Sequence, residues 1–197
     1  MARAAPTATT STIPTDRYGA TAIALHWLLA VAIIGSFGVG LYMADLPFSP
    51  LRLKLFSWHK WAGVTILALS AVRLLWRLAH RPPALPARML AAMPRWQRIA
   101  HPATHGLLYA LFFAVPLSGW AYSSAAGFPV VWFGVLPLPD WVAVDKPLAD
   151  AVLKPLHHAF AFALGAAVLV HVAAALKHQL VDRDGLIWRI WPRKTNP

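Results

Sequence analysis

The sequence predicts an all-α protein that spans a membrane as a bundle of four helices. Of its 197 residues, 58% are hydrophobic and only 13% are charged, whereas a soluble domain usually carries about a quarter charged residues. The hydrophobic residues form four long runs, each reaching the ~20 residues that a helix needs to cross the hydrocarbon core. The charged residues cluster between these runs, which is typical of an integral membrane protein.

The order of segments along the chain predicts one domain after a short tail. Residues 1–15 are rich in Ala, Thr, Ser and Pro, and we expect a disordered cytoplasmic tail there rather than a cleaved signal peptide. Residues 16–193 are expected to form a single transmembrane domain. Its predicted spans run from about Tyr18 to Met43, Phe56 to Leu78, Ile99 to Tyr122 and Leu153 to Leu176. Pro116 is expected to kink the third helix rather than to end it.

A fifth hydrophobic stretch, from Phe128 to Val144, is not expected to cross the membrane. It contains three prolines and Asp140, so its uninterrupted hydrophobic pieces are too short for a span. We interpret it as an interfacial loop with Trp132 and Trp141 near the lipid headgroups.

The basic residues predict the orientation of the helices. Of the 18 Lys and Arg residues, 13 lie before the first span, at or between the second and third spans, or after the fourth. By the positive-inside rule, both termini are therefore expected on the cytoplasmic side. A net charge of +11 would suggest nucleic acid in a soluble protein. Here the charges flank hydrophobic segments, so we expect contacts with the lipid bilayer and no nucleic-acid partner.

The chain has no cysteine. Disulfides, thiolate metal sites, iron–sulfur clusters and covalently attached haem are therefore excluded. The seven acidic residues are all aspartate, and none falls within the predicted spans.

The nine histidines carry the functional prediction, because ionisable groups at membrane depth are costly and point to function. His157 and His171 both lie in the fourth span, and their spacing corresponds to about four turns of a helix. They therefore face nearly the same way and lie ~21 Å apart along the helix axis. One helix thus offers one imidazole near each membrane surface.

Two more histidines lie at matching depths on other helices. His26 in the first span matches His171, and His59 at the start of the second span matches His157. Two imidazoles on facing helices can hold a six-coordinate haem, so the spacing predicts two haem b groups, one above the other. The alternatives are histidines that only pack or form hydrogen bonds, and a site for zinc or another divalent ion. A zinc site usually recruits thiolate or carboxylate ligands, which disfavours it here.

Other residues are expected near these sites. His105 lies near the depth of His26 and His171, so it could replace either ligand or donate a hydrogen bond to a propionate or a quinone. His158 should point away from the bundle. Arg73 is the best candidate partner for the anionic haem propionates, ahead of Arg17, Lys54, Lys60 and Arg77. For each of these residues, extension of the charged end to the lipid headgroups is the alternative. Three glycines could let the haem macrocycle approach a helix closely: Gly35, Gly38 and Gly63. Close packing of a neighbouring helix is the alternative explanation for these glycines.

Several short motifs follow one another along residues 16–193. They are Arg17-Tyr18, Ala24-Leu25-His26-Trp27, His59-Lys60 with Arg73-Leu74 and Arg77, His105 with Pro116-Leu117-Ser118-Gly119-Trp120, Leu156-His157, and His171-Val172-Ala173-Ala174-Ala175-Leu176-Lys177-His178 with Asp182 and Asp184. With these motifs the chain resembles the bacterial four-helix cytochrome b561 family, dihaem membrane cytochromes related to the cytochrome b subunits of hydrogenases. The tail Trp188-Arg189-Ile190-Trp191-Pro192 departs from the family pattern.

The resemblance implies that haem ligands lie at His26, His59, His157 and His171. It implies a multi-pass protein of the bacterial inner membrane that moves single electrons, in the characterised type from periplasmic superoxide to ubiquinone. We expect His178 to serve a cytoplasmic quinone site as proton donor, although a solvated histidine at a helix end is the alternative. A positive field from Lys54 and Lys60 would attract an anionic donor.

The resemblance leaves other functions and partners open. Other family members are electron-transfer subunits, so the second function is a membrane anchor and electron conduit for a dehydrogenase or hydrogenase. The third possible function is a carrier of ions or solutes that binds no haem. Because the Pro-rich loop between the third and fourth spans is long, the electron donor could be either superoxide or a redox protein. A second copy of the chain is a further candidate partner.

Overall fold

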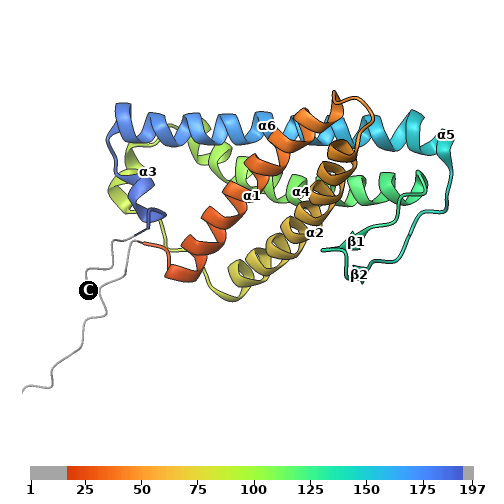
Figure 1. Cartoon of the computed structure of the whole chain (residues 1–197). Coiled ribbons are helices and arrows are strands. Elements are labelled where there is room, and N and C mark those ends of the chain that lie inside the picture. Colours follow the sequence, from red (N-terminus) through yellow and green to blue (C-terminus); the bar gives the residue numbers. More distant parts are fainter. Residues whose placement is uncertain (1–16, 193–197) are drawn as a thin grey trace, which may run out of the picture.

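The structure, a computed structural model that describes residues 17–192, has the predicted all-α architecture around four long helices (Figure 1). The first three are α1 (Ala20–Ala44), α2 (Pro50–Ala79) and α4 (Arg95–Ala125). The fourth helical run joins α5 (Lys146–Leu148), η1 (Ala149–Leu153), α6 (Lys154–Lys177) and η2 (His178–Asp182). All four runs are long and hydrophobic enough to cross a membrane. The tail predicted at residues 1–15 lies outside the described residues.

The helix limits follow from local chemistry. Helix α2 begins at Pro50, well before the predicted span, because the Ser49 side chain accepts a hydrogen bond from the Arg52 N–H and the proline occupies the first turn, where proline is favoured. Helix α4 continues across Pro116, as expected. It ends before Gly127, whose φ of +77° is readily adopted only by glycine.

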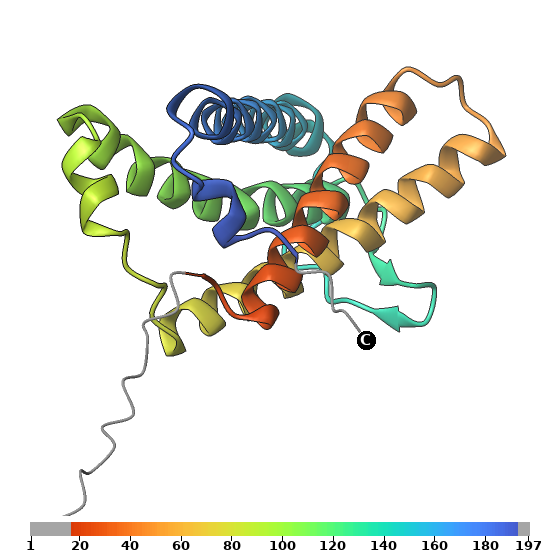
Figure 2. The ribbon, with the colours of Figure 1, turned by 90° about the vertical axis from the view of Figure 1, so that its left-hand side faces the viewer.

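The helices form two antiparallel pairs. Helices α1 and α2 pack together, α4 packs on α6, and α2 also packs on α4. Figure 1 shows α4 and α6 lengthwise, with α1 and α2 crossing them at an angle, and Figure 2 shows the same arrangement from one end. All four helices contribute to the core, which includes Leu29, Ile66, Leu108, Leu111 and Leu164. Many large hydrophobic side chains face outward, as is required of helices in contact with lipid.

The stretch from Phe128 to Val144 does not cross the bundle, as expected, but it contains a short hairpin that was not predicted. Strands β1 (Val131–Trp132) and β2 (Leu136–Pro137) pair antiparallel. The Trp61 indole of α2 donates to the Val131 carbonyl at 2.6 Å. The Trp132 indole donates to Thr65 Oγ1 at 3.2 Å, so Trp132 is held against α2, while Trp141 is largely exposed. We call this end of the bundle the hairpin side.

The first and last described segments meet at the opposite end, which we call the terminus side. The Tyr18 N–H donates to the Arg189 carbonyl, in the 3-10 helix η3 (Leu186–Arg189). The Trp27 indole donates to the Ile190 carbonyl at 3.0 Å. The Arg189 guanidinium in turn donates to carbonyls of the connection after α2, which also carries the short helix α3 (Ala87–Ala92). An even number of long helices thus brings both ends of the described chain to one side.

Candidate functional site

The four histidines predicted as ligands form two pairs, one on each side of the bundle. On the hairpin side, the ring centres of His59 on α2 and His157 on α6 lie 6.2 Å apart. On the terminus side, those of His26 on α1 and His171 on α6 lie 6.3 Å apart. Helix α6 therefore contributes to both pairs, as the spacing of its two histidines predicts.

The two separations fit a metal ion bound between the rings. An iron held by an imidazole nitrogen on each side, at about 2 Å per bond, places the ring centres about 6 Å apart. Direct contact between the rings would allow a shorter separation. Within the described residues, the backbone of α6 makes few close approaches to the backbones of α1 and α2, so the paired imidazoles reach each other across more widely spaced backbones. The donor set therefore fits haem with two axial histidines.

Both hairpin-side imidazoles are oriented by backbone oxygen atoms of a neighbouring helix. His59 Nδ1 lies 3.1 Å from the Ser36 carbonyl of α1, and His157 Nδ1 lies 3.1 Å from the Val115 carbonyl of α4. Because a carbonyl only accepts, Nδ1 must carry the proton in each ring. Nε2 is then left with its lone pair, as a metal ligand requires.

Two glycines make room for these rings. A Cβ atom on Gly40 would lie 3.1 Å from His59 Cε1, and a Cβ on Gly119 would lie 2.9 Å from His157 Cε1. Both distances are shorter than an ordinary van der Waals contact, so a larger residue at either position would displace an imidazole.

The sequence pointed instead to Gly35, Gly38 and Gly63. Apart from the neighbouring backbone of its own helix, a Cβ on any of these three would meet no atom of residues 17–192 within 4 Å. Close packing of a neighbouring helix therefore does not explain them, and the approach of a macrocycle stays a prediction.

The terminus-side pair lies in a cluster of imidazoles. The ring of His105 on α4 is 5.3 Å from that of His171 and perpendicular to it. His105 Nδ1 is 2.8 Å from the His101 carbonyl of its own helix. His105 thus lies beside His171 at a shorter ring separation than in the two predicted ligand pairs, with its orientation fixed by α4.

Two arginines border this cluster. The Arg73 Nε atom donates to the Tyr109 hydroxyl at 3.2 Å, and the Arg77 guanidinium lies 5.8 Å from the centre of the Tyr109 ring. The ion pairs found within residues 17–192 all involve Asp182 or Asp184, so neither arginine has a carboxylate partner there. Cations at membrane depth usually have an anionic partner, and the propionates of a bound haem would supply it.

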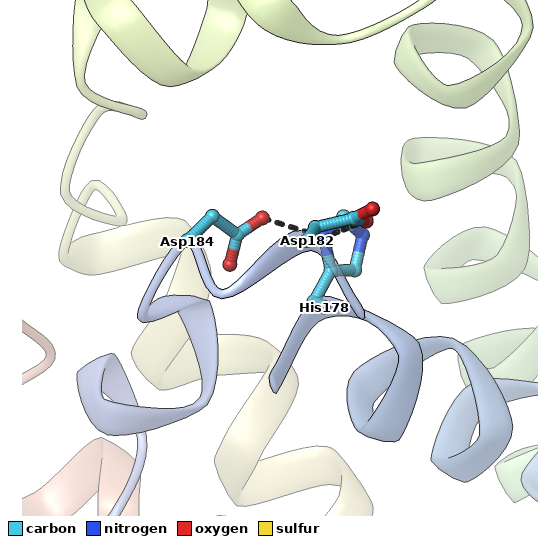
Figure 3. Close-up of side chains that lie close together, drawn as sticks. All are labelled: His178, Asp182 and Asp184. Carbon is cyan, nitrogen blue, oxygen red and sulfur yellow. Dashed lines mark hydrogen bonds and ion pairs between the residues drawn. The ribbon is translucent and has the colours of Figure 1, made fainter. Parts of the chain in front are cut away.

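His178 belongs to a separate network after α6 (Figure 3). Its Nδ1 atom is 2.6 Å from Asp184 Oδ2 and 3.3 Å from Asp182 Oδ2. Lys177 Nζ lies 2.8 and 2.6 Å from the two Asp182 oxygens. Although one histidine and two carboxylates could hold a metal ion, Lys177 and His178 already satisfy these carboxylates. The sequence placed His178 at a helix end, whereas here it begins the π-helical extension η2.

The remaining predicted residues have ordinary surroundings. His158 is exposed, as expected. Lys60 Nζ donates to the carbonyls of Phe128 and Pro129. Lys54 lies over the Trp58 ring, and Arg17 donates to the Trp191 carbonyl. The sequence analysis did not single out Ser36, Gly40 or Val115, because a backbone carbonyl or a close approach does not require a distinctive side chain.

Comparison with known proteins agrees with this geometry. The prokaryotic cytochrome b561 family matches residues 17–193. Cytochrome b561 homolog 2 of Escherichia coli K12 is 33% identical over 181 residues, which cover 89% of this chain and 91% of the relative. The probable superoxide oxidase CybB of Yersinia pestis is 28% identical over 189 residues, or 90% and 97% of the two chains. Cytochrome b561 homolog 1 of E. coli K12 is 26% identical over 182 residues, or 91% and 99%.

With a family match over nearly the whole chain, four membrane-spanning helical runs and two imidazole pairs, the protein belongs to the prokaryotic cytochrome b561 family, whose members are multi-pass bacterial membrane proteins that bind haem b and transfer electrons.

Proposed function

We propose that this protein carries single electrons across the bacterial inner membrane through two haem b groups, from periplasmic superoxide to ubiquinone. The observation that carries the proposal is the presence of one imidazole pair on each side of the bundle, at 6.2 and 6.3 Å. His59 and His157 hold the hairpin-side haem, and His26 and His171 hold the terminus-side haem. When bound, each haem supplies reversible one-electron chemistry.

Residues around the terminus-side pair complete its site. Arg73 is the propionate partner, because it is a partly buried cation that lacks a carboxylate among the described residues. His105 borders the haem without ligating it, since its ring lies beside His171 at 5.3 Å rather than opposite it at about 6 Å.

The proposed direction follows from charge and from the arrangement of the chain ends. Most basic residues among residues 17–192 lie in segments toward the terminus side, so that side faces the cytoplasm and the hairpin side faces the periplasm. Lys54 and Lys60 give the hairpin side a positive field that attracts an anion. The similarity to a probable superoxide oxidase of Yersinia pestis supports superoxide as that anion.

The acceptor reaction requires protons as well as electrons. Two superoxide ions each give up one electron and leave as O2, while one ubiquinone takes up two electrons and two protons. His178 is the proposed proton donor on the cytoplasmic side. Its hydrogen bond to Asp184 keeps the ring in place.

The test is superoxide-dependent reduction of ubiquinone by the purified protein in lipid vesicles. The wild type should catalyse it, and His59→Ala or His171→Ala should abolish it, whereas His158→Ala, an exposed neighbour of His157, should retain it. Lys54→Gln should slow the reaction at low salt and weaken its dependence on ionic strength. A wild type that holds both haems but reduces no ubiquinone with superoxide would rule out this donor and favour an electron conduit for a partner enzyme.

A further inference from the structure

The first and third long helices repeat the same spacing of residues. Ser36 follows His26 in α1 at the same interval at which Val115 follows His105 in α4. Each helix then has a glycine one further turn along, at Gly40 in α1 and at Gly119 in α4.

The second and fourth long helices repeat a spacing of their own. Arg73 follows His59 in α2 at the same interval at which His171 follows His157 in α6. The chain therefore contains two copies of one helix-pair pattern, α1 with α2 and α4 with α6.

The copies match on the hairpin side and differ on the terminus side. On the hairpin side each copy supplies the same parts: an imidazole, a carbonyl that accepts from its Nδ1, and a glycine beside the ring. A serine hydroxyl also lies near each ring, Ser36 Oγ at 3.2 Å from His59 Nδ1 and Ser118 Oγ at 3.3 Å from His157 Nδ1. On the terminus side, one copy has Arg73 where the other has His171.

We infer that the oxygen atoms of Ser36, Val115 and Ser118 make His59 and His157 the more electron-donating ligand pair, so that the hairpin-side haem has the lower reduction potential of the two. The inference rests on the haem ligands proposed above. It assigns to these three residues a role in setting the order of the two potentials.

The physical reason is the hydrogen bond on the far side of each ring. When Nδ1–H donates to a carbonyl, the imidazole becomes a more basic ligand. A more basic axial ligand stabilises ferric iron relative to ferrous iron, which lowers the reduction potential. Both ligands of the hairpin-side haem carry this bond.

The terminus side lacks these bonds and carries positive charge. Within residues 17–192, no hydrogen bond to a ring nitrogen of His26 or His171 is found. Arg73 lies close to this pair, and a nearby cation favours the form of a haem with one more electron. A single electron given up on the hairpin side thus moves to the more oxidising site, with no bond made or broken and no proton required.

The experiment is a potentiometric titration of the purified holoprotein, followed by its visible absorption. The wild type should show two steps. The lower step should disappear in His59→Ala and the upper step in His171→Ala. Ser36→Ala removes one of the two oxygen atoms that share the His59 Nδ1 proton, so it should shift the lower step upward and leave the upper step in place. Ser36→Thr, which keeps a hydroxyl, should restore the wild-type value.

The matched control is Ser57→Ala. Ser57 lies two positions before His59, but its hydroxyl donates to the Leu53 carbonyl of its own helix, so neither step should move. Loss of the upper step in His59→Ala would overturn the inference, as would a shift of the upper step alone in Ser36→Ala. A wild type with fewer than two haems would instead overturn the ligand assignment on which the inference rests.

Discussion

The hairpin-side and terminus-side pairs have nearly the same ring separation but very different surroundings. On the hairpin side, carbonyls and glycines of α1 and α4 fix the rings of His59 and His157. On the terminus side, His26 and His171 lie among other imidazoles and near Arg73. One helix, α6, thus presents two histidines to chemically different surroundings.

The largest expected effect is the selective loss of one haem. His59→Ala or His157→Ala should remove the hairpin-side haem, and His26→Ala or His171→Ala the terminus-side haem, because each iron loses one of its two axial nitrogens. His105→Ala should keep both. Haem content per protein, measured on each purified variant, checks this prediction, and loss of a haem in His105→Ala would mean that the terminus-side ligands are misassigned.

The next largest expected effect is a partial loss of the hairpin-side haem when a glycine beside His157 gains a side chain. In Gly119→Ala the new Cβ would lie 2.9 Å from His157 Cε1, so the ring must shift and the hairpin-side haem should be bound in reduced amount. Gly106→Ala, on the same helix, is the matched control because, apart from its own helix backbone, no atom of residues 17–192 lies within 4 Å of the new Cβ. Equal haem content in the two variants would show that the contact with Gly119 does not position the ring. Gly40→Ala, with a contact of 3.1 Å, should have a weaker effect.

A third prediction tests the charge of the terminus side. Arg73→Gln removes a cation that favours the reduced haem, so the upper reduction potential should fall, by about 59 mV if the interaction changes the equilibrium tenfold. Lys54→Gln, on the hairpin side, should leave the upper potential unchanged. Potentiometric titration of both variants provides the measurement. An unchanged upper potential in Arg73→Gln would place the propionates elsewhere.

The smallest expected effect concerns the segments that cover the two sides. Trp61→Phe removes the hydrogen bond to the Val131 carbonyl, and Trp27→Phe removes the one to the Ile190 carbonyl. Each should destabilise the folded protein by about 1 kcal/mol while preserving both haems. Thermal unfolding in detergent measures this loss. Haem loss in only one of the two variants would show that the segment held by that tryptophan also helps to bind the haem.

The sequence predicted the four helices and the histidine pairs because these depend on local properties. Span length follows from the thickness of the hydrocarbon core, and helical periodicity places His157 and His171 on one face. The helix limits were less accurate at Pro50, where a serine cap lengthens α2. The β1–β2 hairpin was not predicted, since it depends on contacts of a two-residue strand with distant side chains of α2.

The surroundings of the ligands could not be predicted in the same way. Whether Gly38 or Gly40 lies next to His59 depends on how α1 and α2 cross, and two positions along a helix differ by about 200° in direction. Every residue has a backbone carbonyl, so the identity of Ser36 or Val115 alone does not show that its carbonyl accepts a hydrogen bond from a histidine. The intervals repeated between α1 and α4 are the one sequence signal that could have revealed them.

The central claim is that four histidines hold two haems, each between two imidazoles. The most direct measurement combines the pyridine haemochrome ratio of haem to protein with low-temperature electron paramagnetic resonance of the oxidised wild type. We predict a ratio of two and two low-spin ferric signals, because each iron has two strong axial ligands. A ratio of one, or a high-spin signal as the main species, would contradict the assignment.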